Sequence, residues 1–139
     1  FKQHDLFEKR CWLIQAKSPR KILRDSLQKM GAQIILTPVY RNVPVAGDYT
    51  FLLTELEQQK LDWILFASPS AVQNFHQILP SGFWESLAAE PKIACLGKIT
   101  AKAVRDFGWS VQAAPNIQDF EHLVQSICEI NSQISVKYE

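Results

Sequence analysis

One stretch near the middle of the chain constrains the fold most strongly: Trp63-Ile-Leu-Phe-Ala-Ser-Pro-Ser-Ala-Val-Gln-Asn-Phe75. Its first four residues are all large and apolar, as is typical of a parallel strand covered on both faces. Ser68 is a favourable N-cap, and Pro69 suits the first helical position, where a missing N–H costs nothing. The stretch therefore predicts a buried strand, a sharp turn and a helix. The free N–H groups of that turn would lie at the carboxyl end of a strand, where open α/β sheets bind ligands and where anions are favoured.

The same alternation of strand and helix runs along the whole chain. Apolar runs and turn signals predict strands at 11–16, 33–40, 63–66, 92–96 and 110–113, and helices at 18–30, 49–60, 69–79, 98–107 and 118–130. This order predicts an α/β fold: a flavodoxin-like, doubly wound parallel five-stranded sheet with helices on both faces and strand order 2-1-3-4-5. We expect residues 1–139 to form one α/β unit with a frayed tail at 132–139.

The large apolar side chains allow a prediction of the core. We expect all four tryptophans, Trp12, Trp63, Trp84 and Trp109, to fill it rather than to stack on a ligand. The last predicted helix has one apolar face, which we expect to point inward: Phe120, Leu123, Val124, Ile127 and Cys128.

Bulk composition excludes several classes of function. The net charge of +1 provides no field that would favour nucleic acid or a membrane surface, and no apolar run approaches the length of a membrane span. No signal peptide is visible at the start of the sequence. The three cysteines, Cys11, Cys95 and Cys128, lack metal-ligand spacing, and we interpret them as reduced, buried thiols of a cytoplasmic protein.

The standard phosphate, redox and catalytic motifs are absent from the sequence. There is no Gly-x-Gly-x-x-Gly after a strand and no P-loop, and the first strand does not end in the carboxylates of a phospho-receiver domain. His4, His76 and His122 are isolated in sequence, so surface or packing roles are expected for each.

Basic residues near two predicted helix starts break a local rule. Lys17, Arg20, Lys21 and Arg24 share one face, and Lys98 repeats the pattern after the fourth strand, although the helix dipole disfavours cations at an N-terminus. One interpretation is a solvated basic face. The other is an anionic ligand over these N-termini, because local rules tend to fail at functional sites. Further donors would be the hydroxyls of Ser68, Ser70 and Thr100 and the backbone N–H groups of 68–71 and 97–100.

Tyr40 is the remaining singular residue, since it ends the second predicted strand. It would either pack with its ring buried and its hydroxyl wet, or act as a hydrogen-bond donor or weak acid in a cleft.

Three segments, in this order and spacing, resemble the uroporphyrinogen-III synthase family. They are Leu36-Thr-Pro-Val-Tyr-Arg-Asn-Val-Pro44, Ile64-Leu-Phe-Ala-Ser-Pro-Ser-Ala-Val72 and Ile93-Ala-Cys-Leu-Gly-Lys-Ile-Thr-Ala-Lys-Ala-Val104. The closing segment Asp119-Phe-Glu-His-Leu-Val124 also fits, and the resemblance covers roughly residues 11–130.

The resemblance implies a cyclising lyase of tetrapyrrole and heme biosynthesis. That family converts hydroxymethylbilane, a linear tetrapyrrole with eight carboxylates, to uroporphyrinogen III with inversion of the last pyrrole ring, and it uses no metal or organic cofactor. Its site lies between two α/β lobes and holds carboxylates largely through backbone amides. Tyr40 matches the tyrosine that assists loss of the substrate hydroxyl, Ser68 and Thr100 match site-lining positions, and Arg20 matches a family arginine. The expected carboxylate-binding set is completed by Lys17, Ser70, Ala71, Gly97 and Lys98.

Two departures and the length separate this chain from the family pattern. Ala16-Lys-Ser-Pro19 replaces a glycine-rich turn, and Lys98-Ile99 replaces Pro followed by Thr or Val, so the backbone would approach a ligand differently. Family members are about twice as long, and the match is to their C-terminal half. By this resemblance, residues 11–44 belong to one lobe and 45–131 to the other.

The half-length leaves alternatives open. One possibility is that the chain is part of a longer, monomeric enzyme. The second is that it closes alone into one flavodoxin-like domain, and the third is that it exchanges its first βαβ segment with a second copy. The alternative function is a non-catalytic flavodoxin-like module that binds a small anion or a protein partner. A half domain of the periplasmic-binding type is disfavoured because no export signal is visible.

Overall fold

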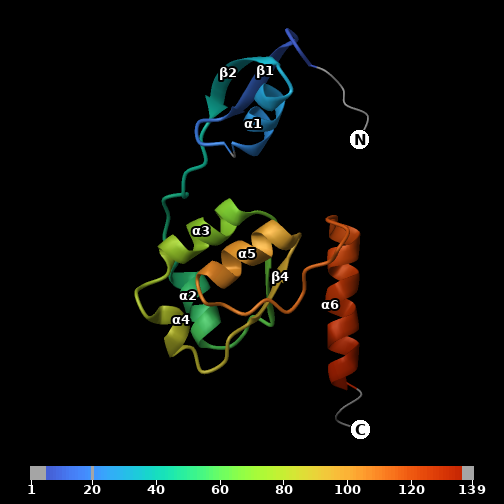
Figure 1. Ribbon diagram of the computed structural model, residues 1–139. Helices are drawn as coiled ribbons and strands as arrows, with labels where there is room; N and C mark the ends of the chain where they lie inside the picture. Colours follow the sequence, from blue (N-terminus) through green and yellow to red (C-terminus); the bar gives the residue numbers. More distant parts are fainter. Residues whose placement is uncertain (1–5, 20, 136–139) are drawn as a thin grey trace. The chain divides into compact units, whose positions relative to one another are not determined.

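The structure is a computed structural model, and it describes residues 6–19 and 21–135 (Figure 1). The chain divides into two compact units, Phe1–Val43 and Pro44–Glu139. Each unit contains its own two-stranded sheet, β1-β2 in the first and β3-β4 in the second.

The first unit is a single βαβ element. It consists of β1 (Arg10–Ala16), α1 (Ile22–Lys29) and β2 (Gln33–Tyr40). The strands pair in parallel, and the register shifts at the end: Gln15 pairs with Pro38 but Ala16 pairs with Tyr40, so that one residue of β2 is extra. Such a β-bulge turns the side chains beyond it relative to the regular alternation.

The ends of α1 follow the sequence only in part. Gly31, which follows the C-cap Met30, has φ +84°, a left-handed conformation that glycine adopts readily at the end of a helix. The predicted start after Ser18 is wrong, because α1 begins at Ile22 and its N-cap is Lys21, whose side chain makes no capping hydrogen bond. An ammonium group has no lone pair to accept from the first-turn N–H groups.

The prediction that Trp12 is a core residue is wrong. Side chains alternate along β1, so that Cys11 and Leu13 are half-buried while Trp12 is 64% exposed. The indole Nε1 of Trp12 donates to Thr37 Oγ1 over 2.8 Å on the neighbouring strand.

The second unit is built around β3 and β4. β3 (Trp63–Phe66) pairs in parallel with β4 (Lys92–Cys95) from Trp63↔Lys92 to Phe66↔Cys95. Each strand leads directly into a helix, and these two helices pack against each other (Figure 1). The helices of this unit are α2 (Thr50–Glu57), α3 (Pro69–Ile78), α4 (Phe83–Ser86), α5 (Lys98–Asp106) and α6 (Phe120–Ser135).

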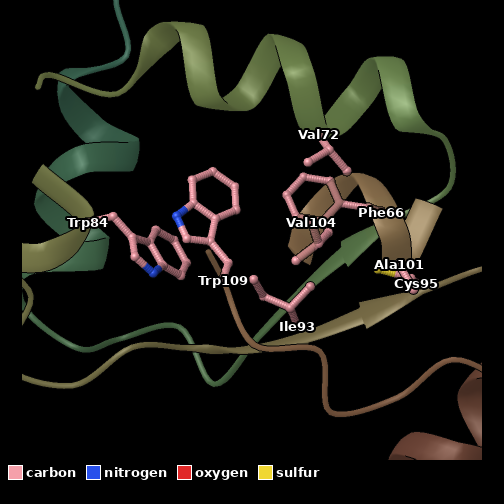
Figure 2. Packing of buried hydrophobic residues seen from close by; sticks show 8 residues of the cluster. All are labelled: Phe66, Val72, Trp84, Ile93, Cys95, Ala101, Val104 and Trp109. Atoms are coloured by element: carbon pink, nitrogen blue, oxygen red, sulfur yellow. The ribbon is translucent and has the colours of Figure 1, made fainter. Parts of the chain in front are cut away.

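Apolar side chains cover both faces of this small sheet. One cluster joins Phe66 and Ile93 to Val72 of α3 and Val104 of α5 (Figure 2). The intervening residues face the other way, where Ala94 packs with Leu123 of α6. This period of two along the strands is what distributes the helices over both faces.

The predicted inward face of α6 is confirmed only in part. Leu123 is buried and packs with Ile127 and Ile130, but Phe120 and Val124 are 65% and 55% exposed, and Cys128 is exposed as well.

Trp84 and Trp109 are core residues, as predicted. Both are 5% exposed and stack with ring centroids 4.6 Å apart.

The single five-stranded sheet with order 2-1-3-4-5 is not confirmed: the described strands form two separate two-stranded sheets. The predicted fifth strand is reduced to an isolated bridge between Ala94 and Ala113. The hydrogen-bond ladder between this segment and β4 is interrupted at Ile93. The N–H of Ile93 donates to the side-chain Oε1 of Gln112 over 2.6 Å, where a regular ladder would have a backbone carbonyl as acceptor.

Candidate functional site

The turn from β3 into α3 has the predicted cap. Ser68 is extended, with φ −152° and ψ 155°, and its Oγ accepts from the N–H of Ala71 over 3.2 Å. Pro69 occupies the first helical position, and Ser70 Oγ lies 3.0 Å from Ser68 Oγ. The structure thus brings Ser68, Ser70 and Ala71 together in one turn, where capping uses part of the hydroxyl capacity.

The turn from β4 into α5 is uncapped. Gly97 is the N-cap and has no side chain to offer. The first helical hydrogen bond runs from Ala101 N–H to Gly97 O, and the N–H groups of Lys98, Ile99 and Thr100 bond to no described residue. These three N–H groups lie at the positive end of the helix dipole, and together they favour binding of an anion there.

Thr100 adds an unpaired hydroxyl to this turn. Its side chain is 5% exposed, yet its Oγ1 bonds to no other described residue. Thr100 Oγ1 is nevertheless open to solvent. In the described part of the chain, Trp84 Nε1 is the only side-chain nitrogen or oxygen atom that is both closed to solvent and without a hydrogen-bond partner. A hydroxyl that bonds to no other described residue and remains open to solvent is available to a ligand or to water.

The two turns lie at the same edge of the sheet. Phe66 pairs with Cys95 at the ends of β3 and β4, and Leu96 N–H donates to Phe66 O over 3.0 Å. The starts of α3 and α5 are therefore neighbours at the carboxyl edge of the strands. This edge gathers six of the predicted site residues: Ser68, Ser70, Ala71, Gly97, Lys98 and Thr100.

The other predicted site residues belong to the first unit. Tyr40 ends β2, is 59% exposed, and its hydroxyl bonds to no described residue. Its backbone O accepts from Lys17 N–H over 2.7 Å, so these two residues are neighbours. Arg20 lies outside the described residues. Arg24, on the predicted basic face, pairs with Asp25 at 2.9 Å.

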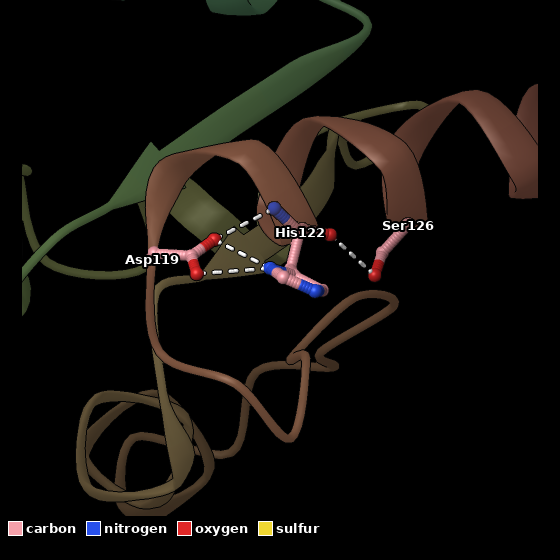
Figure 3. Close-up of polar contacts among 3 residues, drawn as sticks. All are labelled: Asp119, His122 and Ser126. Atoms are coloured by element: carbon pink, nitrogen blue, oxygen red, sulfur yellow. Dashed lines mark hydrogen bonds and ion pairs between the residues drawn. The ribbon is translucent and has the colours of Figure 1, made fainter.

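A row of Asp119, His122 and Ser126 at the start of α6 looks like a catalytic triad but is a helix cap (Figure 3). The Asp119 carboxylate accepts from His122 N–H over 2.8 Å and lies 2.7 Å from His122 Nδ1. Ser126 Oγ donates to the backbone O of His122, not to its ring. The N–H bond from His122 to the carboxylate is the main reason that the pKa of Asp119 is lowered.

An aromatic cavity of about 490 Å³ lies at the other ends of α3 and α5. His76 stacks on Phe107 there, with ring centroids 4.0 Å apart, and Trp84 and Trp109 complete the wall. The cavity contains none of the predicted site residues, because helix C-termini and helix N-termini lie at opposite edges of a parallel sheet.

Sequence reasoning missed Gln118. Its side chain lies directly against Gly97: a Cβ added to that glycine would be 2.6 Å from Gln118 Cδ. Only the glycine itself signalled a close approach, and nothing in the sequence indicated which residue makes it.

The described residues contain neither a metal-binding cluster nor a membrane-spanning helix. No three side chains of the metal-binding types gather in one place. None of the described helices combines the length and the apolar character that crossing a membrane requires.

Comparison with known proteins gives a consistent family. The model of the family described as "Uroporphyrinogen-III synthase HemD" matches residues 1–125. The chain is 28% identical over 130 residues to "Porphyrin biosynthesis protein HemD" of Ruminiclostridium josui, covering 93% of this chain and 26% of that protein. It is also 28% identical to "Uroporphyrinogen-III synthase" of Chlorobaculum parvum, covering 74% of this chain and 41% of the relative.

A solved structure has a similar fold. Thermus thermophilus uroporphyrinogen III synthase superimposes with a TM-score of 0.55 at 20% identity, over 89% of this chain and 51% of that one. The chain thus spans about a quarter to two fifths of the length of these curated relatives and about half of the solved structure.

Proposed function

Because the chain belongs to the uroporphyrinogen-III synthase family, we propose that it acts in tetrapyrrole biosynthesis on the linear tetrapyrrole hydroxymethylbilane. The reaction would be that of a cyclising lyase: loss of the substrate hydroxyl as water and ring closure to uroporphyrinogen III with inversion of the last pyrrole ring. We place this activity in the cytoplasm.

The uncapped start of α5 is the observation that supports this proposal most directly. A substrate with eight carboxylates needs anion sites, and Lys98, Ile99 and Thr100 offer three free N–H groups beside an unpaired hydroxyl. Hydrogen bonds from such donors to an ionised group are roughly twice as strong as those between neutral groups. Ser70 and Ala71 extend the anion site along the start of α3, and Lys98 adds a positive charge.

Tyr40, Lys17 and Arg20 would supply the remaining groups. The C–O bond of the hydroxymethyl group breaks more easily if the departing oxygen receives a proton, and the Tyr40 phenol would donate that proton or position a water that does. Lys17 and Arg20 would hold carboxylates. After ionisation, attack by the substituted carbon of the last ring would give a spiro-type intermediate that rearranges to the inverted ring. The protein's contribution to these steps is mainly positioning.

The test is the isomer ratio of the uroporphyrinogen formed from hydroxymethylbilane. The uncatalysed reaction gives isomer I, so isomer III above the protein-free control is the expected result. Formation of isomer I alone, at the rate of the control, would contradict an activity of this chain by itself.

A non-catalytic module is the second candidate. It is favoured by the two turns in which the chain departs from the family pattern, Ala16-Lys-Ser-Pro19 and Lys98-Ile99. Thermal stabilisation by an octacarboxylated porphyrin without any isomer III would support it, provided that nucleotides do not stabilise the chain.

Association of two copies is a related proposal. A dimer that exchanges residues 11–44 would bring two half-length chains together. Sedimentation equilibrium tests this directly, because the monomer mass is 15.9 kDa.

A further inference from the structure

Gln118 lies at the anion site without belonging to the two helices that form it. It precedes α6 and is exposed, and no described residue bonds to its carboxamide. Its Cδ and Oε1 both come within 2.6 Å of the point where a Cβ of Gly97 would sit, and its Cγ within 2.9 Å.

Gly97, the N-cap of α5, lies directly against this side chain. Gly97 has φ −169° and ψ 174°, an extended conformation that any residue adopts, so backbone geometry does not demand a glycine. A Cβ at this position would come within 2.6 Å of the Gln118 carboxamide, so a larger residue would require this exposed side chain to move. With glycine as the N-cap, no N-cap side chain competes with a ligand for the first-turn N–H groups.

The carboxamide is chemically suited to complete the site. Its Nε2 donates hydrogen bonds without bringing a charge, and a neutral donor costs less to desolvate than an ammonium. It adjoins the residue that precedes Lys98, Ile99 and Thr100, whose N–H groups and hydroxyl are unpaired.

We propose that Gln118 is a further substrate-contacting residue, which donates to a carboxylate held by the first turn of α5 and Thr100. This inference rests on the proposed function, since it deepens the description of the same site. Gly97 and Gln118 then contribute in different ways: the glycine provides no capping side chain, and the carboxamide lies beside it.

The competing explanation is that Gln118 only anchors the loop before α6. Two replacements separate these roles. Gln118→Leu keeps most of the side-chain volume and removes the polar atoms, whereas Gln118→Glu keeps the shape and adds a negative charge beside the anion site. An anchoring role predicts no effect on ligand affinity from either change once the protein is shown to be folded.

The experiment is a titration of the 139-residue chain with an octacarboxylated porphyrin, followed by quenching of tryptophan fluorescence. Gln118→Leu should raise Kd roughly ten- to a hundredfold, the value of one hydrogen bond to a charged group. Gln118→Glu should raise Kd further, and this additional effect should shrink at high salt because added ions screen charge repulsion. Thermal unfolding of each variant confirms that it is folded.

Gln77→Glu is the matched control, because it makes the same change of charge at an exposed position. It lies about 13 Å along α3 from Ser68, at 1.5 Å rise per residue, and should leave Kd unchanged.

The possible failures are distinguishable. If the unmodified chain binds the porphyrin and Thr100→Val weakens binding, but both Gln118 variants bind normally, the assignment of Gln118 is overturned and the proposed function stands. If the unmodified chain does not bind the porphyrin, the proposed function fails and the inference fails with it.

Discussion

The hydroxyl side chains at the candidate site are of two kinds: some form hydrogen bonds that stabilise the fold, and others bond to no described residue. Ser68 Oγ is used by its own helix, whereas Thr100 Oγ1 and the Tyr40 hydroxyl bond to no described residue. Unpaired polar groups do not stabilise the fold, so their replacement separates function from stability.

Tyr40→Phe should lower the rate of isomer III formation by roughly 100-fold or more, because proton transfer by a positioned group contributes about that factor. The melting temperature should be almost unchanged, since the ring is 59% exposed and the hydroxyl bonds to no described residue. Rate and melting temperature would be measured on the same preparation. An unchanged rate would remove Tyr40 from the mechanism.

Cys95 should be the least reactive of the three thiols. It is fully buried beneath α5, and burial raises the pKa of its thiol to about 11 from an ordinary 9.0. At neutral pH a thiol-specific reagent should modify exposed Cys128 rapidly and Cys95 only after unfolding. Rapid labelling of Cys95 in the folded chain would contradict this burial.

The same raised pKa has a consequence for stability. The unfolded chain loses the Cys95 proton from about pH 9, while the folded chain keeps it to about pH 11. The stabilisation is therefore complete below pH 9 and is lost as pH rises toward 11. Cys95→Ala should show a smaller loss of melting temperature over that interval than the unmodified chain.

At the scale of the element, the helices of the Pro44–Glu139 unit differ in how the N–H groups of their first turns are capped. α3 is closed by a serine and a proline, α6 by Asp119, and α5 by nothing among the described residues. α5 is the helix that follows β4 directly, and its start adjoins Gln118.

The Asp119 cap should make α6 sensitive to acid. Because the pKa of Asp119 is lowered by its bonds to His122, this carboxylate stabilises the fold above its ordinary pKa of 3.8. The stabilisation is lost as pH falls from 3.8 through the lower folded value. Helical circular dichroism should fall at lower pH in the unmodified chain, and Asp119→Asn should flatten that part of the curve. A curve of unchanged shape would contradict the role of the cap.

Elements were predictable where the signal was local. The bounds of β2 and β3 are as predicted because both are short apolar runs between turn residues. The fifth strand failed because a side chain, Gln112, takes one of its ladder bonds, which no periodicity encodes. Trp12 was misplaced because Cys11–Ile14 is apolar throughout and does not indicate which face is covered.

The site was predictable to a similar extent. A serine and a proline after a strand predict a cap from residue types alone, and Ser68 makes the predicted bond. Gln118 was not predictable, because its contact with Gly97 joins two loops separated in sequence.

At the scale of the whole molecule, the two units differ in how they bury apolar surface. The Pro44–Glu139 unit covers both faces of its sheet, whereas the Phe1–Val43 unit leaves Trp12 and Ile14 at least 60% exposed. Residues 41–49, between β2 and α2, form no helix or strand, and 41–48 are exposed.

Limited trypsin digestion should separate the units after Arg41. Exposed segments outside regular structure are preferred cleavage sites. Mass spectrometry should find the fragment 42–139 early and persistently, and Arg41→Gln should abolish it while leaving other cuts unchanged. An earlier cut within α5, after Lys102 or Arg105, would contradict the compactness of the Pro44–Glu139 unit.

The bulge near the end of β2 has a consequence for how this chain tolerates insertions and deletions. Ala16 pairs with Tyr40 only because β2 has one residue more than β1 at that point. The direction of the phenol therefore depends on a residue count and not only on the presence of tyrosine. Loss of the single codon for Val39 would leave the tyrosine opposite Ala16 in a regular ladder, and without the bulge its side chain would turn to the other face of the sheet. The proposed role of Tyr40 would then be lost although every side chain named in the proposed chemistry is still present.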